Sequence, residues 1–291
     1  MDSKTIIESI NGKEPVKVEN ETITNTLDFT IIEDKEIIES RLGGTTIVCH
    51  VRSPIEFINC TFDMDIKAYR FITNKNESYT TKFHDNVTFK GCSFRNFVLF
   101  KYSNFRSKGI FEENSFQERV DFKYSNFNDM CKFSYSEFSA KADFKYSSLK
   151  GTSVFEKTIF NEIANFKYLS FTDPVHFQNT FFNDEVDMRY ISFSKEANFN
   201  GSRFNGIANF KYTNFKENTI FSNVRFEDRS DFKYSNFSGN VTFDNAIFEQ
   251  TANFKYANFT KNISFEKTEF KGPLNMKYAS IDRDLIKKYF K

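Results

Sequence analysis

A large apolar residue recurs along most of this chain at alternating steps of five and six residues. The sites begin at Phe89, Phe94, Phe100 and Phe105 and continue without a break in register to Ile281. Of these 36 sites, 32 are phenylalanines, out of 40 in the whole chain. A strict short period predicts stacked, similar units rather than a globular core folded from unlike pieces.

The spacing also predicts the local shape of each unit. Steps of five and six residues fit neither the period of an α-helix nor that of a long strand, but they fit short extended sides joined by corners. The residue two before each site points the same way as the site and is small or aliphatic, as in Val120, Ala142 and Ala208. Glycines such as Gly151 and Gly239 fall two residues after a site, where the backbone has to turn.

Three segments carry a family resemblance: ANFKYTNF (208–215), SDFKYSNF (230–237) and ANFKYANF (252–259). They resemble the pentapeptide-repeat family, whose motif is a small residue, Asp or Asn, a central Leu or Phe, and two variable residues. The resemblance covers roughly residues 57–281 and implies an all-β fold, a right-handed quadrilateral parallel β-helix. This chain is a Phe-centred variant in which every second step is six residues long. Two short and two long steps then make a 22-residue coil, and about nine to ten coils are expected.

The ends of such a rod must be closed. We expect residues 1–56 to form an N-terminal cap, with a short helix at 3–10 that has Ser3 as its N-cap, followed by strands. The β-helix is expected over residues 57–281, beginning at Phe57.

Two other segments depart from the repeat. Residues 63–82 break the register and are predicted to be one irregular loop. Residues 282–291 are predicted to form a short C-terminal capping helix. A homodimer through one of the terminal caps is possible on this arrangement.

Composition narrows the function classes. Forty basic and 39 acidic residues leave no net bias toward nucleic acid or membrane surfaces. No apolar run is long enough for a transmembrane helix, and the N-terminus does not resemble a signal peptide, so a cytoplasmic location is expected. Cys60, Cys92 and Cys131 each stand two residues before a repeat Phe, which predicts buried free thiols.

The sequence gives little support for catalysis. Short corners predict convex faces without a cleft, and His50, His84 and His176 are scattered, with the last two expected to point outward. No nucleophile elbow, phosphate-binding loop or metal-ligating motif is present. We therefore predict a non-enzymatic protein with no catalytic, cofactor-binding or metal-binding residues and no cofactor.

One face of the rod is chemically uniform. Phe-Lys-Tyr, or a close variant of it, recurs once per coil from residue 100 to residue 276, which places all copies on one side. Aspartates two residues before four of the basic side chains are expected to relieve their mutual repulsion. The predicted interaction surface, the Lys–Tyr face, consists of Lys123, Tyr124, Lys145, Tyr146, Lys167, Tyr168, Arg189, Tyr190, Lys211, Tyr212, Lys233, Tyr234, Lys255 and Tyr256.

Several explanations of this face stay open. Duplication alone could have copied it, with stacked tyrosines shielding the rod, or it binds a partner. The leading hypothesis is a protein-interaction scaffold whose partner is another protein. The resemblance implies a first alternative, a DNA mimic that modulates gyrase or another DNA-binding protein. The family includes DNA-mimicking proteins that bind DNA gyrase, and these need an acidic surface. A second alternative is single-stranded nucleic acid along the basic and aromatic stripe, which the balanced net charge makes less favourable.

Overall fold

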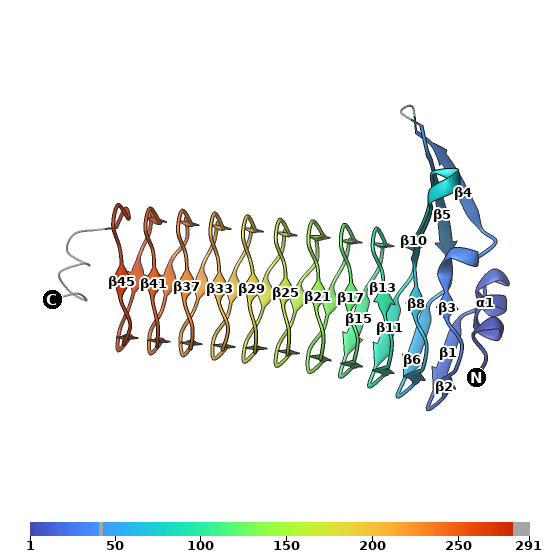
Figure 1. Ribbon diagram of the computed structural model, residues 1–291, viewed down its shortest axis with the longest axis horizontal. Helices are drawn as coiled ribbons and strands as arrows, with labels where there is room; N and C mark the ends of the chain where they lie inside the picture. The colour runs from blue at the N-terminus through green and yellow to red at the C-terminus, as the bar shows by residue number, and fades with distance from the viewer. Residues whose placement is uncertain (41–42, 282–291) are drawn as a thin grey trace.

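The computed structural model describes residues 1–40 and 43–281, and over these residues the chain winds into a long parallel β-helix (Figure 1). The strands form four sheets, here called A to D, one on each side of the coil, with 11 strands in three sheets and 12 in sheet D. This confirms the predicted all-β quadrilateral β-helix and its 22-residue coil. The predicted C-terminal helix at 282–291 lies outside the described residues.

Sheets A and B form two adjacent sides of the rod. Sheet A contains β1 (Val16–Glu19), β6 (Ile55–Ile58), β11 (Val87–Lys90), β15 (Gly109–Glu112), β19 (Cys131–Lys132), β23 (Ser153–Val154), β27 (Val175–His176), β31 (Ala197–Asn198), β35 (Thr219–Ile220), β39 (Val241–Thr242) and β43 (Ile263–Ser264). Sheet B contains β2 (Thr22–Ile23), β7 (Thr61–Phe62), β12 (Ser93–Phe94), β16 (Ser115–Phe116), β20 (Glu137–Phe138), β24 (Ile159–Phe160), β28 (Phe181–Phe182), β32 (Arg203–Phe204), β36 (Arg225–Phe226), β40 (Ile247–Phe248) and β44 (Glu269–Phe270).

Sheets C and D form the other two sides. Sheet C contains β3 (Leu27–Asp28), β8 (Ile66–Lys67), β13 (Val98–Leu99), β17 (Val120–Asp121), β21 (Ala142–Asp143), β25 (Ala164–Asn165), β29 (Val186–Asp187), β33 (Ala208–Asn209), β37 (Ser230–Asp231), β41 (Ala252–Asn253) and β45 (Leu274–Asn275). Sheet D contains β4 (Lys35–Glu39), β5 (Thr45–Val51), β10 (Glu77–Phe83), β14 (Asn104–Phe105), β18 (Asn126–Phe127), β22 (Ser148–Leu149), β26 (Ser170–Phe171), β30 (Ser192–Phe193), β34 (Asn214–Phe215), β38 (Asn236–Phe237) and β42 (Asn258–Phe259), with β9 (Tyr69–Ile72) paired to β10 at one side.

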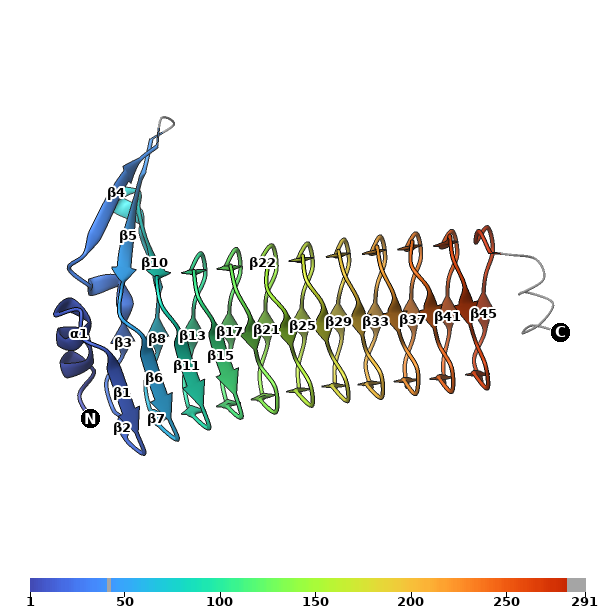
Figure 2. The same cartoon turned by 180° about the vertical axis from the view of Figure 1, so that it is seen from behind.

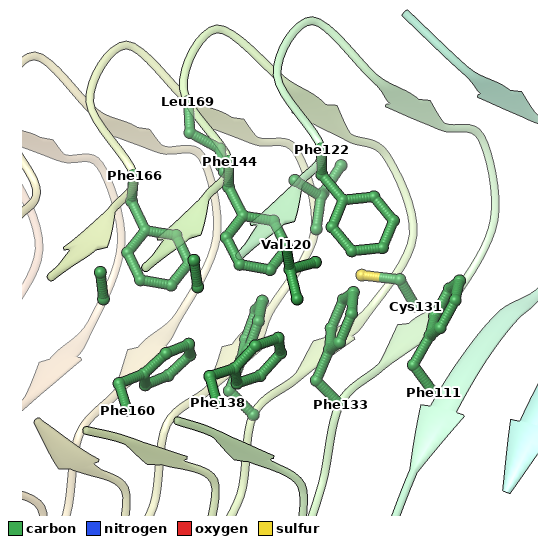
Figure 3. Close-up of a cluster of buried hydrophobic side chains, with 14 of the residues drawn as sticks. Phe111, Val120, Phe122, Cys131, Phe133, Phe138, Phe144, Phe160, Phe166 and Leu169 are labelled. Carbon is green, nitrogen blue, oxygen red and sulfur yellow. The ribbon is translucent and has the colours of Figure 1, made fainter. Parts of the chain in front are cut away.

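The interior is filled by columns of phenylalanine rings (Figure 3). Each strand pairs in register with its counterpart in the next coil, so each Phe lies directly over the equivalent Phe, as Phe105 does over Phe127. Within a column the rings stack: Phe144 and Phe166 have centroids 5.1 Å apart and an interplanar angle of 4°. Between columns they meet edge to face, as Phe155 and Phe166 do at 5.6 Å and 88°. Both geometries suit the quadrupole of an aromatic ring, so the predicted inward register is confirmed.

The alternation of five- and six-residue steps reflects two kinds of corner. The five-residue links join sheet A to B and sheet C to D, and their second residue after the Phe site has a positive φ, for example 62° at Tyr146 and 55° at Lys157. The six-residue links join sheet B to C and sheet D to A, and these corners contain one residue more than the five-residue links. Gly151 and Gly239 lie in links from D to A, where they pack against the backbone of the preceding coil.

The β-helix begins earlier than the predicted boundary at residue 57. Strands β1, β2 and β3 already pair in parallel with β6, β7 and β8, so residues 16–28 form three sides of a first coil. The sequence pattern did not indicate this coil for two reasons. Val18, which pairs with Phe57, is not a phenylalanine, and an insertion between the two residues breaks the regular spacing. Phe29, in the 3-10 helix η1 (Phe29–Ile31), extends the ring packing with its centroid 5.2 Å from that of Phe83.

The predicted N-terminal helix is present, but its cap differs from the prediction. Helix α1 spans Ser3–Asn11 and covers the open end of the first coil (Figure 1). Its N-cap is Asp2 rather than Ser3, because the Asp2 side chain accepts a hydrogen bond from the Lys4 backbone N–H at 3.0 Å. Ser3 is buried in the first turn. A carboxylate at this position also interacts favourably with the positive end of the helix dipole.

Residues 63–82 are not an irregular loop. They contain β8, which stays in register within sheet C, and then β9, the 3-10 helix η2 (Thr73–Lys75) and most of β10. Strands β4, β5, β9 and the outer part of β10 form a four-stranded extension, here called the wing, that projects sideways from the rod near its N-terminal end (Figures 1 and 2). The wing was not predicted because its pairing of β5 with β10 joins segments that lack the repeat spacing.

The four cysteines are buried free thiols, which confirms the prediction for Cys60, Cys92 and Cys131. Burial raises the pKa of the Cys92 and Cys131 thiols to about 12 and that of Cys49 to about 11. These thiols therefore stay protonated near neutral pH and act as small apolar side chains. Within residues 1–40 and 43–281, no helix has the length and apolarity needed to span a membrane.

Candidate functional site: the Lys–Tyr face

The tyrosines of the Lys–Tyr face, extended here to include Lys101, Tyr102, Lys277 and Tyr278 of the coils at its two ends, form one continuous column at the corner between sheets C and D. Consecutive rings from Tyr102 to Tyr278 have centroids 4.8–4.9 Å apart and interplanar angles of 17° or less. Tyr69 of the wing extends the column at its N-terminal end, with its ring centroid 5.3 Å from that of Tyr102. The rings are partly exposed along the rod, for example 40% at Tyr146. The predicted single face is therefore a stacked aromatic column.

Every tyrosine of the column from Tyr102 to Tyr278 lies in the left-handed region of backbone conformation. Their φ angles range from 58° at Tyr102 to 63° at Tyr278, a conformation that bulky residues rarely adopt. The corner between sheets A and B has the same conformation but varied residues there, namely Glu113, Tyr135, Lys157, Asn179, Gly201, Asn223, Asn245 and Lys267. The turn itself therefore does not require tyrosine.

The energetic consequences of these tyrosines partly cancel. A left-handed conformation costs about 1–2 kcal/mol for a residue with a Cβ. An aromatic stack contributes about 0.5–1.5 kcal/mol beyond the burial of its area, and the column has one stack per ring. Stacking thus roughly offsets the backbone strain, and stability by itself gives little reason for tyrosine at every copy.

Most basic residues of the Lys–Tyr face lie against the tyrosine rings. The Nζ atoms of six lysines lie 4.7–5.1 Å from the ring centroid of the tyrosine that follows each of them, a distance that allows cation–π attraction. These are Lys101, Lys145, Lys167, Lys233, Lys255 and Lys277. The lysines therefore line the aromatic column as a basic stripe with their charged groups near the surface.

The remaining three basic residues form ion pairs. Lys123 pairs with Asp121 at 3.5 Å, Arg189 with Asp187 at 2.6 Å, and Lys211 with Asp231 of the next coil at 3.1 Å. The predicted relief of repulsion by the preceding aspartate thus holds within one coil for the first two pairs. Asp231 does not pair with Lys233 of its own coil but with Lys211 of the preceding coil. Asp143 pairs with Lys141, two residues before it, at 3.6 Å.

The aspartates also have a second role that the sequence argument missed. The Oδ1 atom of Asp121 accepts a hydrogen bond from the Lys123 backbone N–H at 3.0 Å, and Asn253 accepts one from the Lys255 N–H at 3.1 Å. This short loop stabilises the corner before each tyrosine from Tyr124 to Tyr278. An asparagine side chain accepts this hydrogen bond as well as an aspartate side chain does. The fold therefore allows either residue at this position along the column.

In several coils the residue after the tyrosine is a serine whose side chain joins neighbouring coils. The Oγ atom of Ser125 donates to the Phe100 carbonyl at 2.7 Å, and that of Ser147 donates to the Phe122 carbonyl at 2.6 Å. Both hydroxyl groups are buried, so the bonds satisfy carbonyl groups that would otherwise be desolvated without a partner. In the Asp-Phe-Lys-Tyr-Ser segments that begin at Asp121, Asp143 and Asp231, only the basic residue and the tyrosine are not buried.

The histidines are not all scattered, contrary to the sequence-based prediction. The Nδ1 atom of His50 lies 2.9 Å from Nε2 of His84, and Nε2 of His50 lies 3.4 Å from a Glu36 carboxylate oxygen. Burial and the facing His50 lower the pKa of His84. The pairing of β5 with β10 brings these residues together, and no sequence motif indicates that pairing. The contacts join the base of the wing to the rod.

The wing also creates a hollow beside the N-terminal end of the tyrosine column. Its lining combines Tyr69, Phe71 and Thr80 of the wing with Tyr102 of the Lys–Tyr face, around a volume of about 360 Å³. Phe71 is 49% exposed. Sequence reasoning missed this part of the surface, because Tyr69 and Phe71 lie outside the repeat period.

Comparison with known proteins identifies the repeat. The family model described as pentapeptide repeats (9 copies) matches residues 189–235 and 232–280. The search of curated proteins and the search of solved structures found no match. Both matched segments contain the Phe-centred sides and the Lys–Tyr corners described above. Residues 189–280 of this chain therefore match the pentapeptide-repeat family.

Proposed function

We propose that this protein is a non-enzymatic scaffold that binds an acidic segment of another protein along the Lys–Tyr face. The single observation that carries this proposal is the tyrosine column. Nine tyrosines from Tyr102 to Tyr278 occupy strained left-handed positions, whereas the equivalent corner between sheets A and B has drifted to many residue types. A uniform, strained and exposed surface is typical of a binding role.

The chemistry of this surface suits an extended acidic partner. One basic side chain per coil, a lysine in every coil except that of Arg189, provides charged donors at a regular spacing. The tyrosine hydroxyls and ring edges provide amphipathic contact area. Three of the nine basic groups are neutralised by ion pairs on the rod. The others keep their charge available for carboxylates.

The ring packing favours a protein over single-stranded nucleic acid. Proteins that bind single strands offer aromatic faces on which bases stack. Here each interior ring already has a neighbouring ring on both sides, so a base would have to separate them. A DNA-mimicking role would need an acidic surface, and the uniform face of this rod is basic.

Charge reversal of the Lys–Tyr face tests the proposal. We expect a variant with Lys145→Glu, Lys167→Glu, Lys211→Glu and Lys233→Glu to lose most of the partner that the wild-type protein captures from its native cell. The reason is that an acidic partner then meets carboxylates instead of ammonium groups. Capture is measured by quantitative mass spectrometry at two salt concentrations, and the wild-type interaction should weaken with salt.

The matched control reverses four lysines at the corner between sheets D and A: Lys150, Lys195, Lys216 and Lys261. It makes the same change in net charge at another position on the rod and should retain the partner. Equal recovery by the two variants would mean that the Lys–Tyr face is not the binding surface.

A further inference from the structure

We propose that two copies of this chain associate through the outer edge of the wing, pairing β4 with β4 of a second copy. Strand β4 is the terminal strand of sheet D and, among the described residues, pairs only with β5. It lies on the side of the wing that faces away from the rod (Figures 1 and 2). All five of its residues are exposed, including Ile37 at 67% and Ile38 at 48%.

The hydrogen bonds of β4 with β5 determine which backbone groups remain at the edge. The His50 N–H donates to the Asp34 carbonyl at 2.8 Å, and the Ser40 N–H donates to the Gly44 carbonyl at 3.0 Å. In an antiparallel ladder, alternate residues direct both backbone groups to the same neighbour. The even-numbered residues therefore face β5, and Lys35, Ile37 and Glu39 direct their N–H and C=O groups outward.

These three residues are self-complementary about a two-fold axis at Ile37. Antiparallel pairing places Lys35 opposite the partner's Glu39, Glu39 opposite the partner's Lys35, and Ile37 opposite the partner's Ile37. Each of these three opposed pairs exchanges both backbone hydrogen bonds. Opposite charges and apolar side chains that lie directly across from each other stabilise a sheet.

Other symmetric registers of the same edge are unfavourable. An axis at Lys35 places two lysines directly opposite each other, and an axis at Glu39 does the same for two glutamates. An axis between neighbouring residues does not work either, because only the odd-numbered residues have outward backbone groups. An axis at Glu36 places two glutamates directly opposite each other. An axis at Ile38 places each Ile37 opposite a Glu39 and forms two rather than three outward pairs within β4. The charges of β4 and the number of outward hydrogen-bonded pairs together favour the register centred on Ile37, and with it a second copy of this chain as the occupant.

The edge also lacks the protection found elsewhere in the molecule. Most strands of the rod are two residues long and are paired on both sides. Strand β4 spans five residues without proline, and Lys35 is its only basic residue. Proteins usually protect such an edge with prolines, bulges or several lysines. Pairing across it joins two wings into one sheet and leaves both Lys–Tyr faces outside the contact.

Sedimentation velocity over a dilution series tests the dimer. We expect the wild-type chain to shift between 34.3 kDa and twice that mass with concentration. Lys35→Glu and Glu39→Lys should each raise the dissociation constant at least about tenfold, because each opposes like charges at two positions. An equimolar mixture of the two variants should recover the dimer, since the chain with two glutamates complements the chain with two lysines.

Two further variants keep the test specific. Ile37→Pro removes an N–H that points outward, so it should abolish the dimer without breaking the ladder to β5. Glu118→Lys changes the charge at an exposed position on the rod and should leave the dimer unchanged. Circular dichroism and thermal unfolding verify that each variant is folded. A wild-type chain that stays monomeric, a dimer insensitive to Ile37→Pro, or a mixture of charge variants that stays monomeric would each overturn the proposal.

Discussion

Phe210→Ala is expected to destabilise the protein by about 3–5 kcal/mol, because it leaves a cavity in the middle of the rod. Phe210 is fully buried. Its ring stacks on Phe232 at 4.9 Å and meets Phe199 and Phe221 edge to face at 5.7 and 5.5 Å. Neighbouring coils are fixed by their own hydrogen bonds and cannot collapse into the space. Equilibrium unfolding in denaturant, followed by circular dichroism, measures the loss.

Two control variants test whether the loss of stability in Phe210→Ala comes from a cavity in the core. Phe210→Leu should cost only about 1.5 kcal/mol, because the shape change is small and Leu149 already fills an equivalent site. Tyr212→Ala, two residues away and 45% exposed at the surface, should cost roughly a tenth to a third of the Phe210→Ala effect. If Tyr212→Ala were as damaging as Phe210→Ala, the assignment of inward and outward residues would be wrong.

Gly239→Ala is expected to cost about 1–3 kcal/mol through overpacking. A Cβ at this position would overlap the backbone carbonyl group of Glu217 and lie 2.7 Å from the backbone nitrogen of Asn218. Both belong to the preceding coil. Because these atoms are held in the stack by main-chain hydrogen bonds, relief requires a shift of the corner rather than a rotation of a side chain. Thermal unfolding of the variant measures the cost.

Gly12→Ala is the control for that substitution. Gly12 has a φ of −70° at the end of α1, and the nearest atom to an added Cβ is the Ser9 carbonyl oxygen at 3.4 Å. Alanine should therefore change the stability by about 0.5 kcal/mol or less. Equal effects at the two glycines would contradict the close contact between coils at Gly239.

The repeat region could be predicted in detail because one pattern determines both its shape and its core. The regular spacing of Phe100, Phe122 and Phe144 leads directly to stacked rings in register. The first coil and the wing could not be predicted in this way. Val18 pairs with Phe57 across an insertion, and the pairing of β5 with β10 depends on contacts between segments that have no periodic signal.

The position of the Lys–Tyr face was predictable, but its internal geometry was not. Spacing placed Lys145 and Tyr146 at the same corner as their counterparts. The positive φ of Tyr146 and the packing of Lys145 against its ring at 4.7 Å depend on the turn that the coil makes. Likewise, the Asp143 side chain accepts a hydrogen bond from the Lys145 backbone at 3.3 Å, a contact that spacing alone does not indicate.

The central claim is that the tyrosine column is maintained for binding, and replacement of its tyrosines by asparagine tests this claim most directly. Asparagine adopts the left-handed conformation readily, so Tyr146→Asn, Tyr168→Asn and Tyr190→Asn together should leave the rod folded, with a loss of about 1 kcal/mol per site. The matched control places asparagine at Glu113, Tyr135 and Lys157, which have the same backbone conformation at the corner between sheets A and B.

The measurement is the amount of partner captured by these two folded variants relative to the wild-type protein. The account predicts that the variant with asparagines in the tyrosine column loses most of the captured partner and that the control retains it. Equal capture by both variants, with both rods folded, would contradict it and would mean that the tyrosines serve only the rod.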